Sequence, residues 1–157
     1  EGVENYMILI GGEVVVKGVN QNGVCWRTGI NLPEDDPDGI KNNYDEIVQL
    51  CKKGAIATSG NYRNFYIKDG KKYAHTIDPR TGYPAEQSVL SATIVANDCM
   101  TADAYATAFM AMGLEKARQM ADSLPEIEYY VIYADENGKH QIEYSKGMLQ
   151  YLPKREQ

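Results

Sequence analysis

Short apolar runs separated by turn residues dominate most of this chain. Residues 5–10 (NYMILI) and 14–19 (VVVKGV) flank the glycine pair Gly11–Gly12, and residues 88–97 (SVLSATIVAN) form the clearest apolar run. Runs of this length, bounded by Gly, Asn and Asp, are typical of β-strands. Paired glycines between two such runs indicate a turn, a bulge or a close approach of the backbone to another group.

Turn signals divide the other β-rich segments into hairpins. NQNG at residues 20–23 predicts a hairpin turn with residues 24–30 as the returning strand. Residues 65–77 predict a second hairpin around KDG, and residues 126–145 a third around NG. Residues 44–60 are ambiguous but favour strand, and residues 31–43, with two prolines and several acids, predict an exposed loop.

One helical region interrupts the strands. Residues 98–113 are rich in Ala and Met and end at Gly113, and residues 114–125 continue as an amphipathic helix that ends at Pro125. The order of strands, helical pair and strands predicts a single α+β domain over residues 1–157, with a mostly antiparallel sheet and a central helical pair.

Composition narrows the possible partners and the role of the cysteines. The net charge of −6 makes nucleic acid a poor candidate partner, and no apolar run reaches the length that spans a bilayer. Three cysteines, Cys25, Cys51 and Cys99, make a poor disulfide framework and have no spacing typical of a metal site. We therefore expect buried or incidental thiols.

Asp103 and Thr107 are the first candidate site. They are four residues apart in the predicted helix and so lie on one face. Their Ala and Met neighbours predict a buried helix, in which an ionised carboxylate needs compensation, and Mg²⁺ would supply it. Alternatively, Asp103 is a first-turn acid stabilised by free backbone N–H groups.

The stretch YAHTIDPRTGYPA, residues 73–85, is the second candidate. His75 falls near the end of a predicted strand, where it can act as a general base near neutral pH, and Arg80 can hold a phosphate or carboxylate. Alternatively, Asp78 caps the turn, Arg80 is solvated and His75 is an ordinary strand residue.

The third candidate is ATSGNY, residues 57–62. Small residues after a strand let a ligand approach the backbone, and Thr58, Ser59 and nearby amides can donate hydrogen bonds. The dinucleotide and P-loop patterns are absent from the sequence, so nucleotide binding by those routes is not supported.

Taken in order, the segments NYMILIGGEVVVKG, WRTGI, GAIATSGNYRNFYIKDGKKYAHTIDPRTGYPA and DCMTADAYATAFMAMG resemble the C-terminal half of the ApbE family. The family comprises FAD:protein FMN transferases, once called thiamine-biosynthesis lipoproteins, with an α/β fold related to T-fold proteins. The resemblance implies FAD as substrate, Mg²⁺ as cofactor, and transfer of FMN to a Thr or Ser hydroxyl of a target flavoprotein with release of AMP.

The same resemblance suggests individual roles. Asp103 and Thr107 would be metal ligands, and His75 would take the proton of the acceptor hydroxyl. Thr76 would lie against FAD, and Ser59, Gly60 and Arg80 are further candidates for FAD contacts. Some relatives carry an acid directly before the metal-binding Thr, where this chain has Ala106.

The resemblance also predicts an incomplete pocket. The family has an upstream half that adds FAD and metal contacts, so we expect this chain to be a C-terminal portion that binds FAD weakly and is inactive alone. Two alternatives are an FAD pyrophosphatase giving FMN and AMP, and a non-catalytic flavin-binding or interaction module. The resemblance implies a location outside the cytoplasm, on the periplasmic side in bacteria, with any membrane anchor outside these residues.

Overall fold

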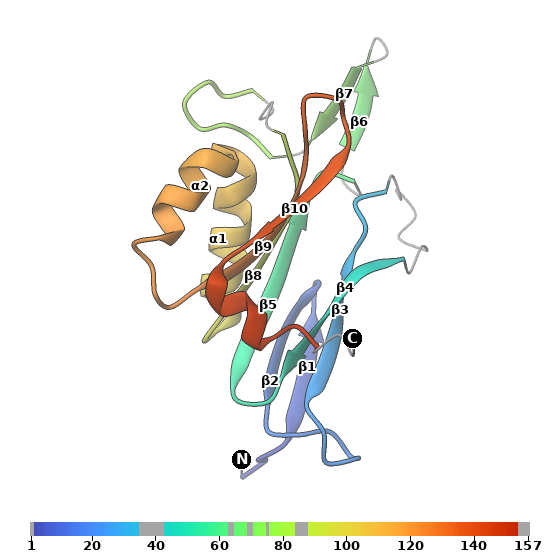
Figure 1. Ribbon diagram of the computed structural model, residues 1–157, viewed down its shortest axis with the longest axis vertical. Helices are drawn as coiled ribbons and strands as arrows, with labels where there is room; N and C mark the ends of the chain where they lie inside the picture. Colours follow the sequence, from blue (N-terminus) through green and yellow to red (C-terminus); the bar gives the residue numbers. More distant parts are fainter. Residues whose placement is uncertain are drawn as a thin grey trace.

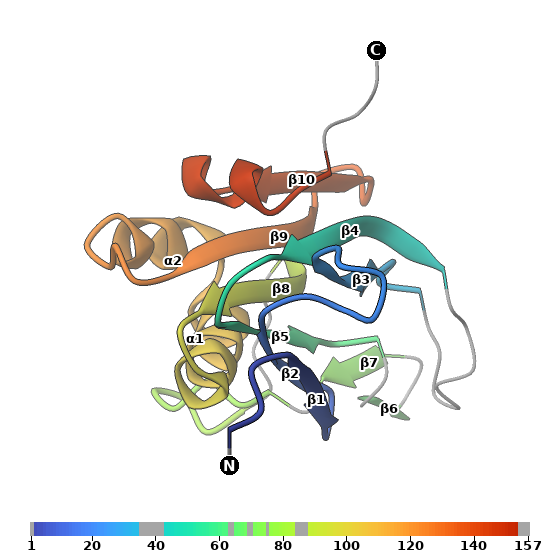
Figure 2. The same cartoon turned by 90° about the horizontal axis from the view of Figure 1, so that it is seen from below.

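A six-stranded antiparallel sheet lies between two α-helices and a two-stranded ribbon (Figures 1 and 2). The computed structural model describes residues 2–34, 43–62, 65–68, 71–74, 76–83 and 88–153. In chain order the elements are β1 (Tyr6–Ile10), β2 (Glu13–Lys17), β3 (Trp26–Asn31), β4 (Tyr44–Leu50), β5 (Gly54–Gly60), β6 (Phe65–Lys68), β7 (Lys71–Ala74), β8 (Val89–Ala96), α1 (Cys99–Met112), α2 (Leu114–Ala121), β9 (Glu128–Ala134), β10 (His140–Tyr144) and the 3₁₀ helix η1 (Lys146–Gln150). The predicted α+β class with a mostly antiparallel sheet is confirmed.

The sheet order is β1-β2-β5-β8-β9-β10, so β8 lies near the centre. Side chains alternate between the two faces of each strand. On β8, Ala92, Ile94 and Ala96 face the helices, whereas Val95 faces the ribbon. Because both faces are covered, nearly every residue of β8 is buried, which explains why its apolar run was the clearest in the sequence.

Helix α1 packs on the sheet through small residues. Its buried positions are Ala102, Ala106, Phe109 and Met110, a spacing that places all four on one face. Asp98 caps the N-terminus by accepting a 2.8 Å hydrogen bond from the Thr101 amide, and this bond lowers the pKa of Asp98. Gly113, at φ 81°, separates α1 from α2.

The second helix is shorter than predicted. Helix α2 ends at Ala121, and Ser123 and Leu124 form a turn before Pro125 is reached. Within the described part of the chain, the helices are too short or too polar to cross a bilayer.

The ribbon β3–β4 covers the other face of the sheet. Ile30, Val48 and Leu50 pack against Val14 and Val16 of β2. The predicted pairing of residues 24–30 with the preceding strand is wrong. The 20–23 turn forms, but one bridge, Val19↔Cys25, joins its two sides. The strand then pairs with β4, while β2 pairs with β1 and β5.

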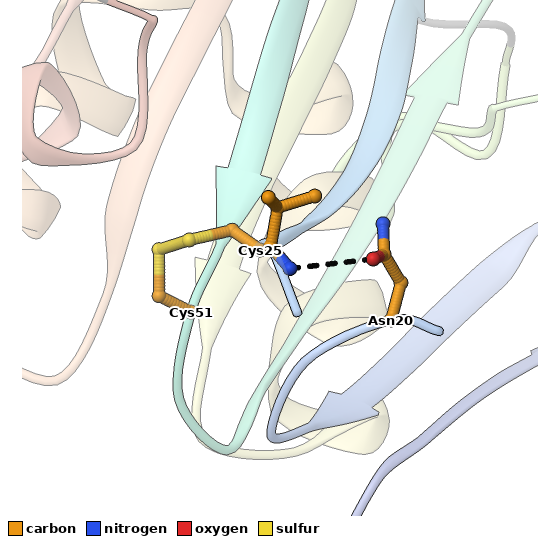
Figure 3. The surroundings of a disulfide bond; sticks show 4 residues. Asn20, Cys25 and Cys51 are labelled. Atoms are coloured by element: carbon orange, nitrogen blue, oxygen red, sulfur yellow. Dashed lines mark hydrogen bonds between the residues drawn. A yellow bond between two sulfur atoms is a disulfide. The ribbon is translucent and has the colours of Figure 1, made fainter. Parts of the chain in front are cut away.

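A disulfide joins Cys25 and Cys51, with a Cα–Cα distance of 4.4 Å (Figure 3). Trp26 is opposite Leu50 in the β3–β4 register, so the two cysteines are the next opposed pair. Asn20 holds the adjoining turn because its Oδ1 accepts from the Val24 amide. The expectation of three unpaired thiols is therefore wrong, and the odd count leaves Cys99 as the free one.

The disulfide gives a direct prediction. Alkylation of the denatured, unreduced chain should modify one cysteine, and alkylation after reduction should modify three, as read by intact mass. The C25S/C51S double variant should lose about 3 kcal/mol of unfolding free energy, because the bridge closes a loop in the unfolded chain. The C99S variant is the control and should change stability far less. Modification of all three cysteines without reductant would contradict the pairing.

Candidate functional site

The site begins where the pairing between β2 and β5 stops. The last pair is Val14↔Ile56, after which the chain turns away at Gly11–Gly12. On its other side, β5 stays paired with β8 as far as Gly60↔Ser91. Among the described residues, β5 therefore has one open backbone edge from Ala57 to Gly60, with N–H and C=O groups that can face a ligand.

A cleft of about 360 Å³ lies at this open edge. Its walls come from the β1–β2 turn, β2, β3, β5 and α1. The lining residues are Gly11, Gly12, Glu13, Val14, Thr28, Gly29, Asn31, Ile56, Thr58, Ser59, Gly60, Tyr62, Asp103 and Thr107. Because the edge of β5 is free, a ligand there can contact groups that belong to both faces of the sheet.

Asp103, Thr107, Ser59 and Gly60, four of the residues predicted from the sequence, line this cleft together. Asp103 and Thr107 are one turn apart on α1, and the Thr107 hydroxyl lies 3.2 Å from the Ser59 hydroxyl. This hydrogen bond joins α1 to β5.

The predicted burial of Asp103 is wrong. Asp103 and Thr107 are both exposed, because the buried stripe of α1 runs through Ala102 and Ala106, one position round the helix. Alanine is small enough for either environment, and Met100 is 80% exposed, so the Ala- and Met-rich composition did not predict which side is buried. The alternative is also wrong, since the first turn of α1 contains no acid and Asp98 caps it.

The oxygen atoms at the cleft suit a hard cation. The lining includes the carboxylates of Glu13 and Asp103 and the hydroxyls of Ser59 and Thr107, which are ligands that Mg²⁺ accepts. Mg²⁺ usually completes its shell with water and substrate phosphates. The described residues contain no group of three or more His, Cys, Asp or Glu side chains arranged for a metal. These oxygen ligands therefore suit a cation that the protein and a phosphate ligand coordinate together, rather than a cation enclosed by protein ligands alone.

The loop of residues 76–83 lies outside the lining of this cleft. Asp78 accepts from the Arg80 amide at 2.9 Å and from the Arg80 guanidinium at 3.0 and 2.6 Å. Asp78 thus caps the turn, as in the alternative reading, while Arg80 keeps 61% of its side chain exposed. Thr76 is buried, and His75 lies outside the described residues. Arg80, Thr76 and His75 remain predictions from the resemblance.

The cleft also contains residues that the sequence did not single out, namely Thr28, Gly29 and Asn31 of β3. Tyr62, the last residue of the predicted ATSGNY stretch, forms part of the wall as well. A Cβ on Gly60 would lie 2.3 Å from the Tyr62 ring, and one on Gly29 would lie 2.1 Å from the Tyr44 ring. Only the pairing of β3 with β4 brings the β3 residues here, and the sequence did not predict that pairing.

Comparison with known proteins identifies the family of this chain. Residues 1–131 match the sequence profile of the ApbE family. This chain belongs to the ApbE family. The flavin transferase ApbE of Vibrio cholerae superposes with a TM-score of 0.79 and 39% identity, over 96% of this chain and 45% of that one. The ApbE protein of Thermotoga maritima superposes with a TM-score of 0.77 and 31% identity, over 96% and 45%.

Curated relatives carry the same family name. The FAD:protein FMN transferases of Vibrio cholerae and Escherichia coli K12 are 45% and 38% identical over 123 and 120 residues. The matches cover 78% and 76% of this chain but 35% and 33% of those proteins. This ApbE chain thus spans about a third of the length of the curated relatives it matches.

The contact between Gly60 and Tyr62 gives a prediction for this ApbE chain. Gly60→Ala should push the buried Tyr62 ring aside and lower the unfolding free energy by about 1–3 kcal/mol. Gly54→Ala on the same strand is the matched control, because its Cβ would meet neighbours only at 3.6 Å and beyond. Urea denaturation of both variants is the measurement. Equal stability of the two variants would contradict the proposed clash.

The Asp78–Arg80 pair gives a second prediction. Hydrogen bonds from Arg80 lower the pKa of Asp78 from 3.8 to about 2. Because the folded-state pKa is depressed, the pair stabilises the fold above pH 3.8, and this contribution is lost as the pH falls towards 2. Carbon-13 NMR titration should find this low pKa, and R80Q should return it towards 3.8. An unchanged pKa in R80Q would show that Arg80 is not the cause.

Proposed function

We propose that this chain forms one wall of an FAD-binding site, and that the protein transfers FMN from FAD to a Thr or Ser hydroxyl of a target flavoprotein. The observation that carries the proposal is the convergence of Asp103, Thr107, Ser59 and Gly60 at the open edge of β5. The family relationship supports it, because the curated relatives of Vibrio cholerae and Escherichia coli are named FAD:protein FMN transferases.

In the proposed reaction, the acceptor hydroxyl oxygen attacks the phosphorus on the FMN side of the FAD pyrophosphate. A new phosphoester P–O bond forms, the P–O bond to the AMP phosphate breaks, and AMP leaves. The hydroxyl proton goes to a general base, a role assigned to His75 by resemblance. A positioned base contributes about 10²–10⁴-fold to such a step.

The chain's own groups have distinct tasks in this scheme. Asp103 and Thr107 would hold Mg²⁺, which when bound neutralises charge on the pyrophosphate. Ser59 keeps Thr107 in place through their hydrogen bond, and the small residues at the edge of β5 let the pyrophosphate approach backbone amides. Thr76 and Arg80 are proposed FAD contacts from the 76–83 loop.

We also propose a location outside the cytoplasm, on the periplasmic side in bacteria. The Cys25–Cys51 disulfide supports this proposal, because structural disulfides persist mainly in oxidising compartments. The family resemblance points in the same direction.

A chimera tests the proposed activity. The aligned region of the Vibrio cholerae transferase is replaced by this chain, and FMN transfer to an acceptor peptide is followed by mass spectrometry. The chimera should modify the peptide, and D103N should lower the rate at least about tenfold by removing a metal ligand. The matched control is D122N, which removes a carboxylate at the end of α2, outside the cleft lining.

The products separate the competing functions. Free FMN and AMP without peptide modification would support a pyrophosphatase instead, and absence of both products would support a non-catalytic module. We expect the chain by itself to bind FAD more weakly than micromolar and to show no transfer. Isothermal titration with FAD and Mg²⁺ measures this directly, and micromolar affinity would contradict it.

A further inference from the structure

Two threonine hydroxyls on neighbouring strands form a hydrogen bond beside the cleft. Thr58 on β5 and Thr93 on β8 are directly opposed in the register, and their Oγ1 atoms are 2.8 Å apart. The two residues differ in their access to solvent. Thr58 is exposed and lines the cleft, whereas Thr93 is 0% exposed and lies outside the cleft lining.

This difference in burial decides which hydroxyl donates. A hydroxyl has one hydrogen to donate and two lone pairs that accept. Thr58 Oγ1 is the one side-chain partner that the described residues offer to Thr93. If Thr58 donated, the Thr93 hydrogen would be buried without an acceptor, which is costly, whereas the Thr58 hydrogen can always reach water or a ligand.

We propose that Thr93 is a positioning residue that donates to Thr58 Oγ1 and thereby turns the Thr58 hydroxyl hydrogen into the cleft. Thr58 then presents a fixed donor to an acceptor oxygen of the ligand, on the ribbon-facing side of β5. Ser59, the next residue, presents its hydroxyl on the helix-facing side beside Thr107. Only the identity of the ligand, FAD, rests on the proposed function.

A ligand at this edge would therefore meet hydroxyls from both faces of one strand. This is possible because, among the described residues, no strand pairs with β5 on that edge beyond Ile56. Ordering the Thr58 donor costs little free energy when a ligand binds, because a residue in the packed interior of the sheet already sets its orientation. Asp103 and Thr107 lie on the other side of the strand, so Thr58 adds a contact that the metal ligands cannot make.

The direction of the hydrogen bond can be read by NMR on the whole chain. The slowly exchanging hydroxyl proton should correlate with the Cβ of Thr93 and should disappear in T93V. The Thr58 hydroxyl proton should exchange rapidly with solvent. A protected hydroxyl proton that correlates with the Cβ of Thr58, with none on Thr93, would overturn the proposal.

Thermal unfolding gives an independent measurement. T58V leaves the buried Thr93 hydroxyl without an acceptor and should lower Tm by about 4 °C. T93V leaves an exposed hydroxyl that water can satisfy, so it should change Tm little, and T58V/T93V should recover most of the loss. Equal losses in both single variants, with no recovery in the double variant, would overturn the proposal.

Ser91 supplies the matched control. It is also fully buried on β8 and two residues from Thr93, but its Oγ has no partner among the described residues. S91A should therefore leave both Tm and ligand affinity unchanged or improved.

Titration of the Vibrio cholerae chimera with FAD and Mg²⁺ completes the test. In the chimera, T93V should weaken binding about fivefold, T93S should restore it, and S91A should not weaken it. Equally strong binding by the chimera with and without T93V would overturn the positioning role. A chimera that binds no FAD would contradict the proposed function alone, because the proton assignment and the Tm pattern of the chain still decide the hydroxyl pair.

Discussion

The end of the β2–β5 pairing is the constraint on which the cleft depends. An antiparallel sheet normally satisfies both edges of an interior strand, and β5 is satisfied on both sides only as far as Ile56. Gly11 and Gly12, both at positive φ, let the chain turn there at little steric cost. Had β2 continued for three or four residues, its backbone would fill the space that the cleft occupies. The site thus lies where the sheet lacks a stretch of strand beside β5. The elements around it are held in place by packing elsewhere in the fold.

The surrounding layers keep this open edge in place. Helix α1 is held by Ala102, Ala106, Phe109 and Met110 against β5 and β8, so Asp103 and Thr107 face the gap without being buried themselves. On the other face, the β3–β4 ribbon is not part of the large sheet, and a two-stranded ribbon is marginal alone. Its core residues, the Trp26 indole bond to the Lys17 carbonyl and the Cys25–Cys51 disulfide together fix it. The β3 wall of the cleft therefore depends on contacts some distance away.

The sequence predicted the secondary-structure elements better than it predicted which strands pair with one another. Residues 88–97 and 98–113 were clear because a strand buried on both faces and a helix with a glycine stop have strong local patterns. The partner of β3 was not readable, since a hairpin turn at 20–23 does form but the strands diverge after one bridge. The same error concealed the disulfide, which requires Trp26 opposite Leu50, and the β3 part of the cleft, which requires the β3–β4 ribbon to pack on the sheet. For Asp103, the position on the helix was predicted correctly and the burial wrongly, since alanine does not distinguish the two faces.

The Thr58–Thr93 pair connects this fold to the proposed chemistry. A site at a sheet edge offers many acceptors, because every strand carries carbonyl groups, but a phosphate requires donors. Backbone amides at the open edge supply some, and hydroxyls supply others only if their hydrogens point outward. A hydroxyl whose oxygen already accepts a hydrogen bond from a buried donor has its own hydrogen held in the outward direction. A hydroxyl that faces water on all sides must instead be ordered when the ligand binds. The fully buried Thr93, which never touches the ligand, therefore belongs to the binding site in the energetic sense, and the choice of threonine at that interior position follows from the chemistry at the edge.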